Sequence, residues 1–153
     1  MNELNSFDKA VDFLTTIGIV VKFEPIDSAT FLPGVSIENG QIIVDREKMK
    51  YPGDILHEAG HIAVVPAKDR STLNEQTIIQ REQRDAEEMM VIAWSYAACV
   101  HLGIDAGFVF HDDDLELFAS IQAFFLLIIG TNCAINTPNR IRKQPMSARP
   151  VRV

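Results

Sequence analysis

The sequence His57-Glu58-Ala59-Gly60-His61 constrains this chain more than any of its other features. In an α-helix, residues i and i+4 lie on one face, so His57 and His61 can present two imidazole nitrogens to the same cation. Glu58 lies one position further along the helix, where its carboxylate can reach a water molecule beside that cation. The pattern therefore predicts a helix that binds a metal ion and carries a general base.

The residues around the motif favour the helix that this prediction requires. Pro52 and Asp54 suit a first helical turn, because proline loses no hydrogen bond there and a carboxylate complements the helix dipole. Pro66 ends the run, which places the helix at about residues 53–65. The alternative is a half-buried helix with two ordinary histidines. The surrounding residues are strongly apolar, and burying these polar groups unsatisfied is costly, which favours metal binding.

A catalytic zinc site usually takes three protein ligands, so the motif needs one more. Val64 and Ala67 stand where the three-histidine extension of the motif has Gly and His, which excludes that class. The acidic run 82–88 precedes a very apolar stretch and supplies the candidates Glu82, Asp85, Glu87 and Glu88. The alternative for each is a solvated helix surface with weak ion pairs. Glu88, the last carboxylate before the apolar stretch, is the preferred ligand.

Helix geometry separates Glu88 from its neighbour Glu87, because adjacent helical residues point about 100° apart. The side chains on the face through Glu88 are small or apolar and include Ile92, Ser95 and Cys99. This face can therefore pack close to the motif helix. The face through Glu87 is bulkier and includes Met90, Val91 and Trp94. We therefore expect Glu88 to face the metal, with Glu87 as the second choice.

With these residues the chain resembles the zincin metallopeptidases, specifically the short gluzincin-like type of the ImmA/IrrE family. The resemblance covers roughly residues 35–100, as a strand or hairpin, the motif helix and a second helix with an acidic ligand. In that family the ligand glutamate precedes a hydrophobic–alanine pair, which Glu88 matches with Ile92 and Ala93. Met89 stands where the family usually has alanine, and the Leu-Leu-Met-Pro ending is absent. The resemblance implies a zincin-like fold with zinc bound by His57, His61 and Glu88.

These residues predict a zinc-dependent metallopeptidase that hydrolyses peptide bonds in a peptide or protein substrate. Zinc would activate the attacking water, and Glu58 would take its proton as the general base. The alternative is a catalytically silent zincin-fold protein that acts as an interaction or regulatory module. The small size of the chain supports that alternative, whereas the intact Glu58 argues against it. A non-peptidase metallohydrolase is a third possibility.

The N-terminal half predicts one helix and three strands. Asn5 or Ser6 caps a helix over residues 7–16, which ends at Gly18, and residues 19–23 form a strand rich in β-branched residues. Residues 35–37 and 41–44 flank Asn39-Gly40, the strongest short signal for a β-hairpin. The hairpin is also the expected platform for an extended substrate, as the resemblance to zincins implies.

The C-terminal half is expected to be helical. Residues 67–74 form a polar loop, in which Thr72 and Glu75 predict a capping box before a long helix over about residues 75–102. Another helix is expected at about residues 114–129. This order predicts an α+β fold, with a small antiparallel sheet packed on a helical layer that carries the motif.

Composition and charge constrain the domain organisation and the possible partners of the chain. A chain of 153 residues with 47% hydrophobic content is expected to form a single domain with a substantial core. A net charge of −7 and a pI near 5.0 disfavour a nucleic-acid partner. Residues 138–153 are the exception, a basic tail with prolines that is expected to be solvated; a docking segment is the alternative.

Three features predict a cytoplasmic protein without a membrane partner. The first ten residues contain no basic apolar leader. Cys99 and Cys133 stand in apolar surroundings and are expected to be buried free thiols. The apolar stretch 117–129 is too short to span a membrane and is interrupted by Ser120 and Gln122, so we expect a core helix. The sequence leaves the oligomeric state open.

The remaining histidines and aromatic residues are assigned structural roles. His111 precedes an acidic helix start, where Asp112–Asp114 suit N-capping rather than calcium binding. The alternative for His111 is a role in oxyanion or metal binding. His101 is expected to be a core or helix-end histidine, and Trp94 and Tyr96 are expected to pack in the core.

Overall fold

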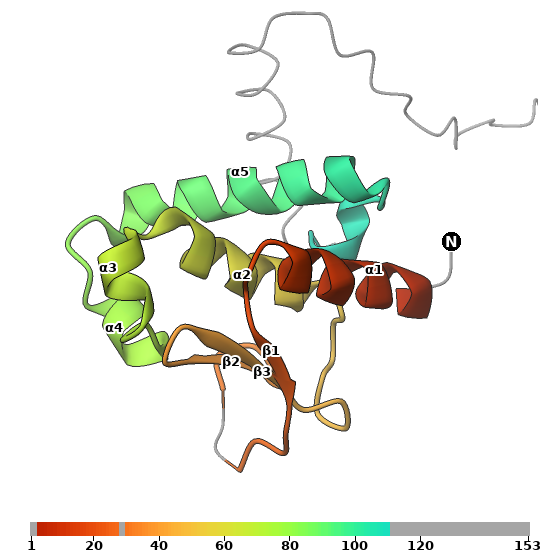
Figure 1. The fold of residues 1–153 in the computed structure, drawn as a ribbon, viewed down its shortest axis with the longest axis horizontal. Coiled ribbons are helices and arrows are strands. Elements are labelled where there is room, and N and C mark those ends of the chain that lie inside the picture. The colour runs from red at the N-terminus through yellow and green to blue at the C-terminus, as the bar shows by residue number, and fades with distance from the viewer. Residues whose placement is uncertain (1–2, 28–29, 111–153) are drawn as a thin grey trace, which may run out of the picture.

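In the computed structural model, which describes residues 3–27 and 30–110, helices cover one side of a small sheet (Figure 1). The main helices are α1 (Glu3–Thr16), α2 (Asp54–Val64) and α5 (Arg84–Leu102). The short helices are α3 (Ala67–Arg70), α4 (Glu75–Ile79) and the 3₁₀ helix η1 (Ala106–Phe108). The strands are β1 (Val21–Phe23), β2 (Val35–Glu38) and β3 (Gln41–Val44). The expected α+β class is confirmed.

The sheet is mixed, so the expectation of an antiparallel sheet was wrong. β2 and β3 form the expected antiparallel hairpin, with Val35 opposite Val44. β1 instead pairs parallel with β3, with Val21 opposite Ile42, which gives the order β1-β3-β2. The connection from β1 to β3 contains β2 and the loop before it, and this length allows a parallel partner. Propensity identifies a strand, but it does not identify the neighbour or its direction.

The hairpin turn follows from two residues with left-handed backbone conformations. Asn39 has a φ of 50° and Gly40 a φ of 70°, as a two-residue turn between twisted strands requires. Gly40 is also required by packing, because a Cβ there would lie 2.0 Å from the carbonyl oxygen of Arg70. The turn therefore lies directly against α3.

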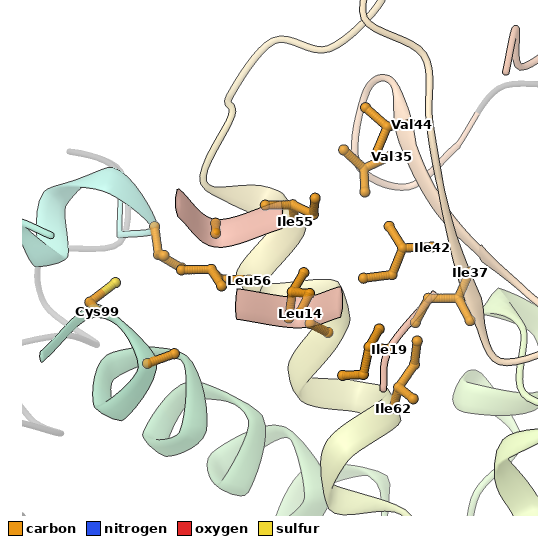
Figure 2. Close-up of a cluster of buried hydrophobic side chains, with 14 of the residues drawn as sticks. Leu14, Ile19, Val35, Ile37, Ile42, Val44, Ile55, Leu56, Ile62 and Cys99 are labelled. Atoms are coloured by element: carbon orange, nitrogen blue, oxygen red, sulfur yellow. The ribbon is translucent and has the colours of Figure 1, made fainter. Parts of the chain in front are cut away.

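The hydrophobic core surrounds α2, which lies between the sheet and α5. Buried apolar side chains from α1, the sheet, α2 and α5 converge there, and Figure 2 shows Leu14, Ile19, Val35, Ile37, Ile42, Val44, Ile55, Leu56, Ile62 and Cys99. The structure places α2 at residues 54–64, against an expected 53–65. Because the motif lies on this enclosed helix, packing on both sides limits its movement.

The expected helix over residues 75–102 is interrupted. α4 ends at Ile79, and α5 begins only at Arg84. α4 packs against β2 whereas α5 packs against α2, and one straight helix cannot follow both surfaces. The sequence contains neither Gly nor Pro at the break, so local propensity gives no sign of it.

Three further local expectations were wrong. The capping box uses Asn74 and Thr77 rather than Thr72 and Glu75. The Asn74 Oδ1 accepts from the Thr77 backbone N–H at 2.9 Å, and the Asn74 N–H donates to the Thr77 Oγ1 at 2.8 Å. The polar loop 67–74 also contains the short helix α3. α1 begins at Glu3, before the expected start at Phe7.

Several other predictions are also decided by the described residues. Cys99 is a buried free thiol as expected, and burial raises its pKa to about 12. His101 lies exposed in the last turn of α5, and Trp94 packs against the core beside Phe13. Within residues 3–27 and 30–110, no helix is long and apolar enough to cross a membrane. Cys133, His111, the helix expected at 114–129 and the basic tail lie outside the described residues.

Candidate metal centre

The two motif histidines and Glu88 meet at the contact between α2 and α5. His57 and His61 lie one turn apart on α2, with ring centroids separated by 5.1 Å. In the second turn of α5, Glu88 places its Oε1 3.3 Å from the His57 Nε2 and its Oε2 3.6 Å from the His61 Nε2. One ligand atom from each residue lies within 4.8 Å of the others, close enough to hold a metal ion.

Two imidazoles and one carboxylate that lie this close together can hold a metal ion. Nitrogen and oxygen ligands lie about 2.0–2.2 Å from zinc, so tetrahedral neighbours are separated by about 3.3–3.6 Å. The separations between Glu88 and the two histidines, 3.3 and 3.6 Å, involve different carboxylate oxygens, Oε1 and Oε2, and the three ligand atoms of the group lie within 4.8 Å of one another. In the part of the chain that the structure describes, no other group of three His, Cys, Asp or Glu side chains comes together in this way.

Glu87 has a different partner from Glu88. Its Oε2 accepts a hydrogen bond from the Arg81 Nε at 2.6 Å, and the Arg81 Nη2 lies 3.6 Å from Asp69. Glu82 and Asp85, the other acidic candidates, do not belong to the group around the histidines. The structure therefore brings Glu88, and not Glu87, to the two motif histidines.

Close packing of α2 against α5 sets the position of Glu88. A Cβ at Gly60 would lie 2.8 Å from the Val91 Cγ1 and 3.2 Å from the Val91 carbonyl oxygen. The Ser95 hydroxyl donates to the Leu56 carbonyl oxygen at 3.2 Å and to that of Val91 at 2.8 Å. The prediction that one face of α5 contacts α2 is confirmed at three positions. Its side chains Ile92, Ser95 and Cys99 are all buried. Val91, assigned to the bulkier face through Glu87, also packs against α2, because the contact is wider than one stripe.

Glu58 is buried beside the ligand group. Only 6% of its surface is exposed, and it lines the same cavity as the two histidines and Glu88. Burial raises the pKa of Glu58 to about 7; the charge of His57 opposes this shift, and Glu75 and Asp54 add to it. A carboxyl group that titrates near neutrality is suited to both accept and donate a proton.

The protonation states of the three ligand residues are set by burial and by their contacts. Burial lowers the pKa of His61 to about 4, and the charge of His57 contributes to this shift. The hydrogen bond from His57 lowers the pKa of Glu88, against the effect of burial. Burial alone would lower the pKa of His57, but Glu88 and the charge of Glu58 raise it overall. The pKa shifts of His61 and Glu88 favour the neutral imidazole and the ionised carboxylate that bind metals, whereas the pKa shift of His57 favours its protonated form, which must lose a proton to bind a metal.

The group opens into a cavity of about 300 Å³. Its other lining residues come from α4, from the start of α5 and from the segment before β2: Phe31, Glu75, Ile78, Ile79, Arg84 and Asp85. Phe31 is 81% exposed and Ile79 is 57% exposed, so the cavity has an apolar rim open to solvent. Sequence reasoning missed Ile78 and Ile79, because only the break between α4 and α5 brings α4 beside the motif. It also missed Phe31, which lies before β2 and reaches the cavity only through the tertiary fold.

Comparison of the chain with protein family models, with curated proteins and with solved structures finds no match.

Proposed function

We propose that the protein is a zinc-dependent metallopeptidase. His57, His61 and Glu88 would bind the zinc ion, and Glu58 would act as the general base. One observation carries this proposal: the buried Glu58 carboxylate shares a cavity with His57, His61 and Glu88, which lie close enough together to hold a metal ion. A helix with only a structural role gains nothing from such a carboxylate. A buried carboxylate without a binding partner lowers the stability of the fold.

The donor chemistry supports zinc in particular. Two imidazoles and one carboxylate form a three-ligand set found in catalytic zinc sites, which leave a fourth position for water or substrate. When bound, zinc polarises the carbonyl group of a substrate and lowers the pKa of a coordinated water toward neutrality. Calcium and magnesium prefer sites made of oxygen ligands alone, which His57 and His61 do not provide.

Glu58 would move the protons of the reaction. Its ionised form accepts a proton from the attacking water, and its protonated form then delivers that proton to the leaving amine. A pKa of about 7 leaves both forms accessible near neutral pH. Glu88 keeps its carboxylate ionised and adjacent to both histidines, which fixes the direction of their Nε2 atoms.

A peptide in extended conformation suits the surroundings of the site. β2 is an edge strand of the sheet, and Phe31, which precedes it, lines the cavity that contains Glu58. An edge strand offers backbone groups with which an extended chain can pair. A cavity of about 300 Å³ accommodates side chains on either side of one peptide bond but not a folded protein. The proposed substrate is therefore an unfolded or flexible segment.

Zinc-loaded protein incubated with a library of unstructured peptides, with products followed by mass spectrometry, tests this proposal. Glu58→Gln should retain stoichiometric zinc and lose about 10²–10⁴-fold in kcat, because the amide cannot accept the proton. His57→Ala should lose zinc as well. Asp12→Asn, an exposed change on α1, is the control and should retain both zinc and cleavage.

Three outcomes would contradict the proposal. Full hydrolysis by Glu58→Gln would remove Glu58 from the mechanism. Stoichiometric zinc without cleavage of any peptide would instead favour the alternative of a silent fold that serves as an interaction or regulatory module. Zinc content unchanged in His57→Ala would show that the motif does not hold the metal.

A further inference from the structure

The cavity beside the metal ligands has a wall that the proposed mechanism does not use. His57, Glu58, His61 and Glu88 belong to that mechanism. The remaining lining residues are three apolar, two acidic and one basic: Phe31, Ile78, Ile79, Glu75, Asp85 and Arg84. A wall of this mixture suits a ligand that is apolar along most of its length and charged at its end.

One face of α4 presents a carboxylate next to an apolar surface. Glu75, Ile78 and Ile79 are spaced i, i+3 and i+4, so they lie on the same side of the helix, about 5–6 Å apart. All three line the cavity, with Glu75 and Ile78 half-buried and Ile79 exposed. The four-carbon stem of a lysine side chain is long enough to lie along this face, from Ile79 to the carboxylate.

Phe31 extends the apolar surface from another part of the chain. It precedes β2, lines the same cavity and is exposed. Among the described residues, neither Phe31 nor Ile79 belongs to the hydrophobic core. Large apolar side chains that stay exposed around a cavity indicate a binding site, because their burial by a ligand is favourable. The aromatic face of Phe31 also attracts a cation placed over it.

The carboxylates that line the cavity are available to a ligand. Within residues 3–27 and 30–110, neither Glu75 nor Asp85 forms a hydrogen bond or an ion pair through its carboxylate. Glu87, which does not line this cavity, is bonded to Arg81. Glu58 is only 6% exposed, and it likewise accepts no hydrogen bond from a described residue. A buried polar group without a protein partner indicates a ligand that supplies one.

Arg84 does not cancel the negative charge of this wall. It lies one turn before Glu88 on α5, and its charge adds to the effect of His57 in lowering the pKa of Glu88. Burial is the main cause of the raised pKa of Glu58, and the charge of Glu75 adds to that shift. Two carboxylates against one guanidinium leave the wall negative, which favours a cationic ligand.

We propose that this wall binds the side chain of a lysine or arginine residue of the substrate, next to the bond that is cleaved. The aliphatic stem packs against Phe31 and Ile79. Glu75 binds the cation, with Asp85 as the second carboxylate of the wall. The inference rests on the proposed function only in taking a peptide as the ligand. An uncharged apolar side chain and the free N-terminal amine of a peptide are the rival occupants.

Binding of two matched peptides to the zinc-loaded protein tests the inference without relying on turnover. Acetyl-Ala-Lys-Ala-amide carries the charge, and acetyl-Ala-norleucine-Ala-amide has the same stem without it. Dissociation constants come from NMR titration of the isotope-labelled protein, in which the amide signals of Ile79 and Asp85 should shift. The lysine peptide should bind at least about threefold more tightly, because its ammonium gains a partly exposed ion pair. Equal affinities, or tighter binding of the norleucine peptide, would overturn the inference.

Charge variants locate the cation. Glu75→Gln combined with Asp85→Asn should abolish the preference for lysine and leave the affinity for the norleucine peptide unchanged. Glu82→Gln, an exposed change outside this cavity, is the matched control and should keep the preference. Glu75→Lys combined with Asp85→Lys should instead favour acetyl-Ala-Glu-Ala-amide. A lysine preference that survives in the neutral double variant also overturns the inference.

Two further measurements address the stem and the source of the charge. Phe31→Ala changes an exposed side chain and should weaken the binding of both peptides while zinc is retained. Unchanged affinities would contradict the apolar contact. The norleucine peptide with a free N-terminal amine supplies the other kind of cation. If it binds as tightly as the lysine peptide, the carboxylates bind the amine and the inference fails.

Failure of this inference is distinguishable from failure of the proposed function. Lysine-selective binding without cleavage of any peptide would contradict the peptidase and leave the binding site in place. Cleavage of library peptides with no preference for Lys or Arg beside the cleaved bond would do the reverse.

Discussion

At the scale of single residues, Glu87 and Glu88 show how two identical neighbours acquire different roles. The Glu88 carboxylate lies between two imidazoles, whereas the Glu87 carboxylate accepts a 2.6 Å hydrogen bond from Arg81. The first contact assembles a ligand group, and the second fixes the turn between α4 and α5. The difference follows from the angle of about 100° between adjacent helical residues.

Zinc titration of two alanine variants separates these roles. Glu88→Ala should lower the zinc affinity at least about tenfold, because one of three ligands is lost. Glu87→Ala is the matched control and should change the affinity little. The reverse order would transfer the ligand role to Glu87, and equal small effects would place the third ligand elsewhere.

Asp45, directly after β3, is a second residue with a definite electrostatic role. Its carboxylate accepts hydrogen bonds from the backbone N–H groups of Ile26 and Glu47, both at 3.0 Å. Lys48 lies 3.7 Å away and also contacts the carbonyl oxygen of Ile26. These contacts, led by that from Ile26, hold the pKa of Asp45 below its ordinary value of 3.8.

Acid denaturation tests this role. The carboxyl group binds a proton at higher pH when unfolded than when folded, so the stabilisation is complete above the ordinary pKa. It is lost as the pH falls through 3.8 and on through the lower folded-state pKa. The free energy of unfolding should therefore fall less steeply below about pH 4 in Asp45→Asn than in the wild type. Asp12→Asn, at an exposed position of α1, should follow the wild-type curve; identical curves for all three would refute the role.

At the scale of elements, the contact between α2 and α5 forms the site. α2 contributes His57 and His61, and α5 contributes Glu88, so the distance between the helices sets the distance between the ligands. Gly60 permits the close approach, because Val91 occupies the space that a side chain would need. The break before α5 also shapes the site, because it allows α4 to form one wall of the cavity.

Gly60→Ala should therefore affect both stability and metal binding. The added methyl group meets Val91, and overpacking of this kind costs about 1–3 kcal/mol in the free energy of unfolding. Displacement of α5 should also weaken zinc binding, as measured by titration. The control is the combination with Val91→Ala, which removes the clashing side chain. The double variant should recover part of both losses, and strictly additive losses would show that the two residues do not interact.

At the scale of the whole molecule, a bound zinc ion would join two helices that are far apart in the sequence. Its three ligands come from residues 57, 61 and 88, and an unfolded chain does not hold them together. Binding therefore adds to the stability of the fold. The size of the effect depends on the ratio of free zinc to the dissociation constant.

Metal removal provides the corresponding measurement. At free zinc about 100 times the Kd, the fold gains about 2.7 kcal/mol, which corresponds to roughly 5–10 °C in Tm. Thermal unfolding with and without a chelator should show this difference in the wild type. His57→Ala should unfold at the same temperature in both conditions. An equal shift in that variant would mean that zinc stabilises the fold from another position.

The sequence alone determined the features that depend on neighbouring residues. The i and i+4 spacing brings His57 and His61 together on any helix, and Asn39-Gly40 adopts the left-handed conformations that a tight hairpin needs. Propensity and end signals located α2 to within a residue at either end. All of these depend on contacts within a few positions along the chain.

Only the tertiary structure decided the features that depend on distant residues. The parallel partner of β1, the break between α4 and α5, and the approach of Phe31 and Ile79 to the motif have no local signal. Sequence favoured Glu88 over Glu87, but only the packing of Val91 on Gly60 sets its distance from the histidines. The physical reason is that burial and close packing are decided where elements meet, and these outweigh the small preferences of any single segment.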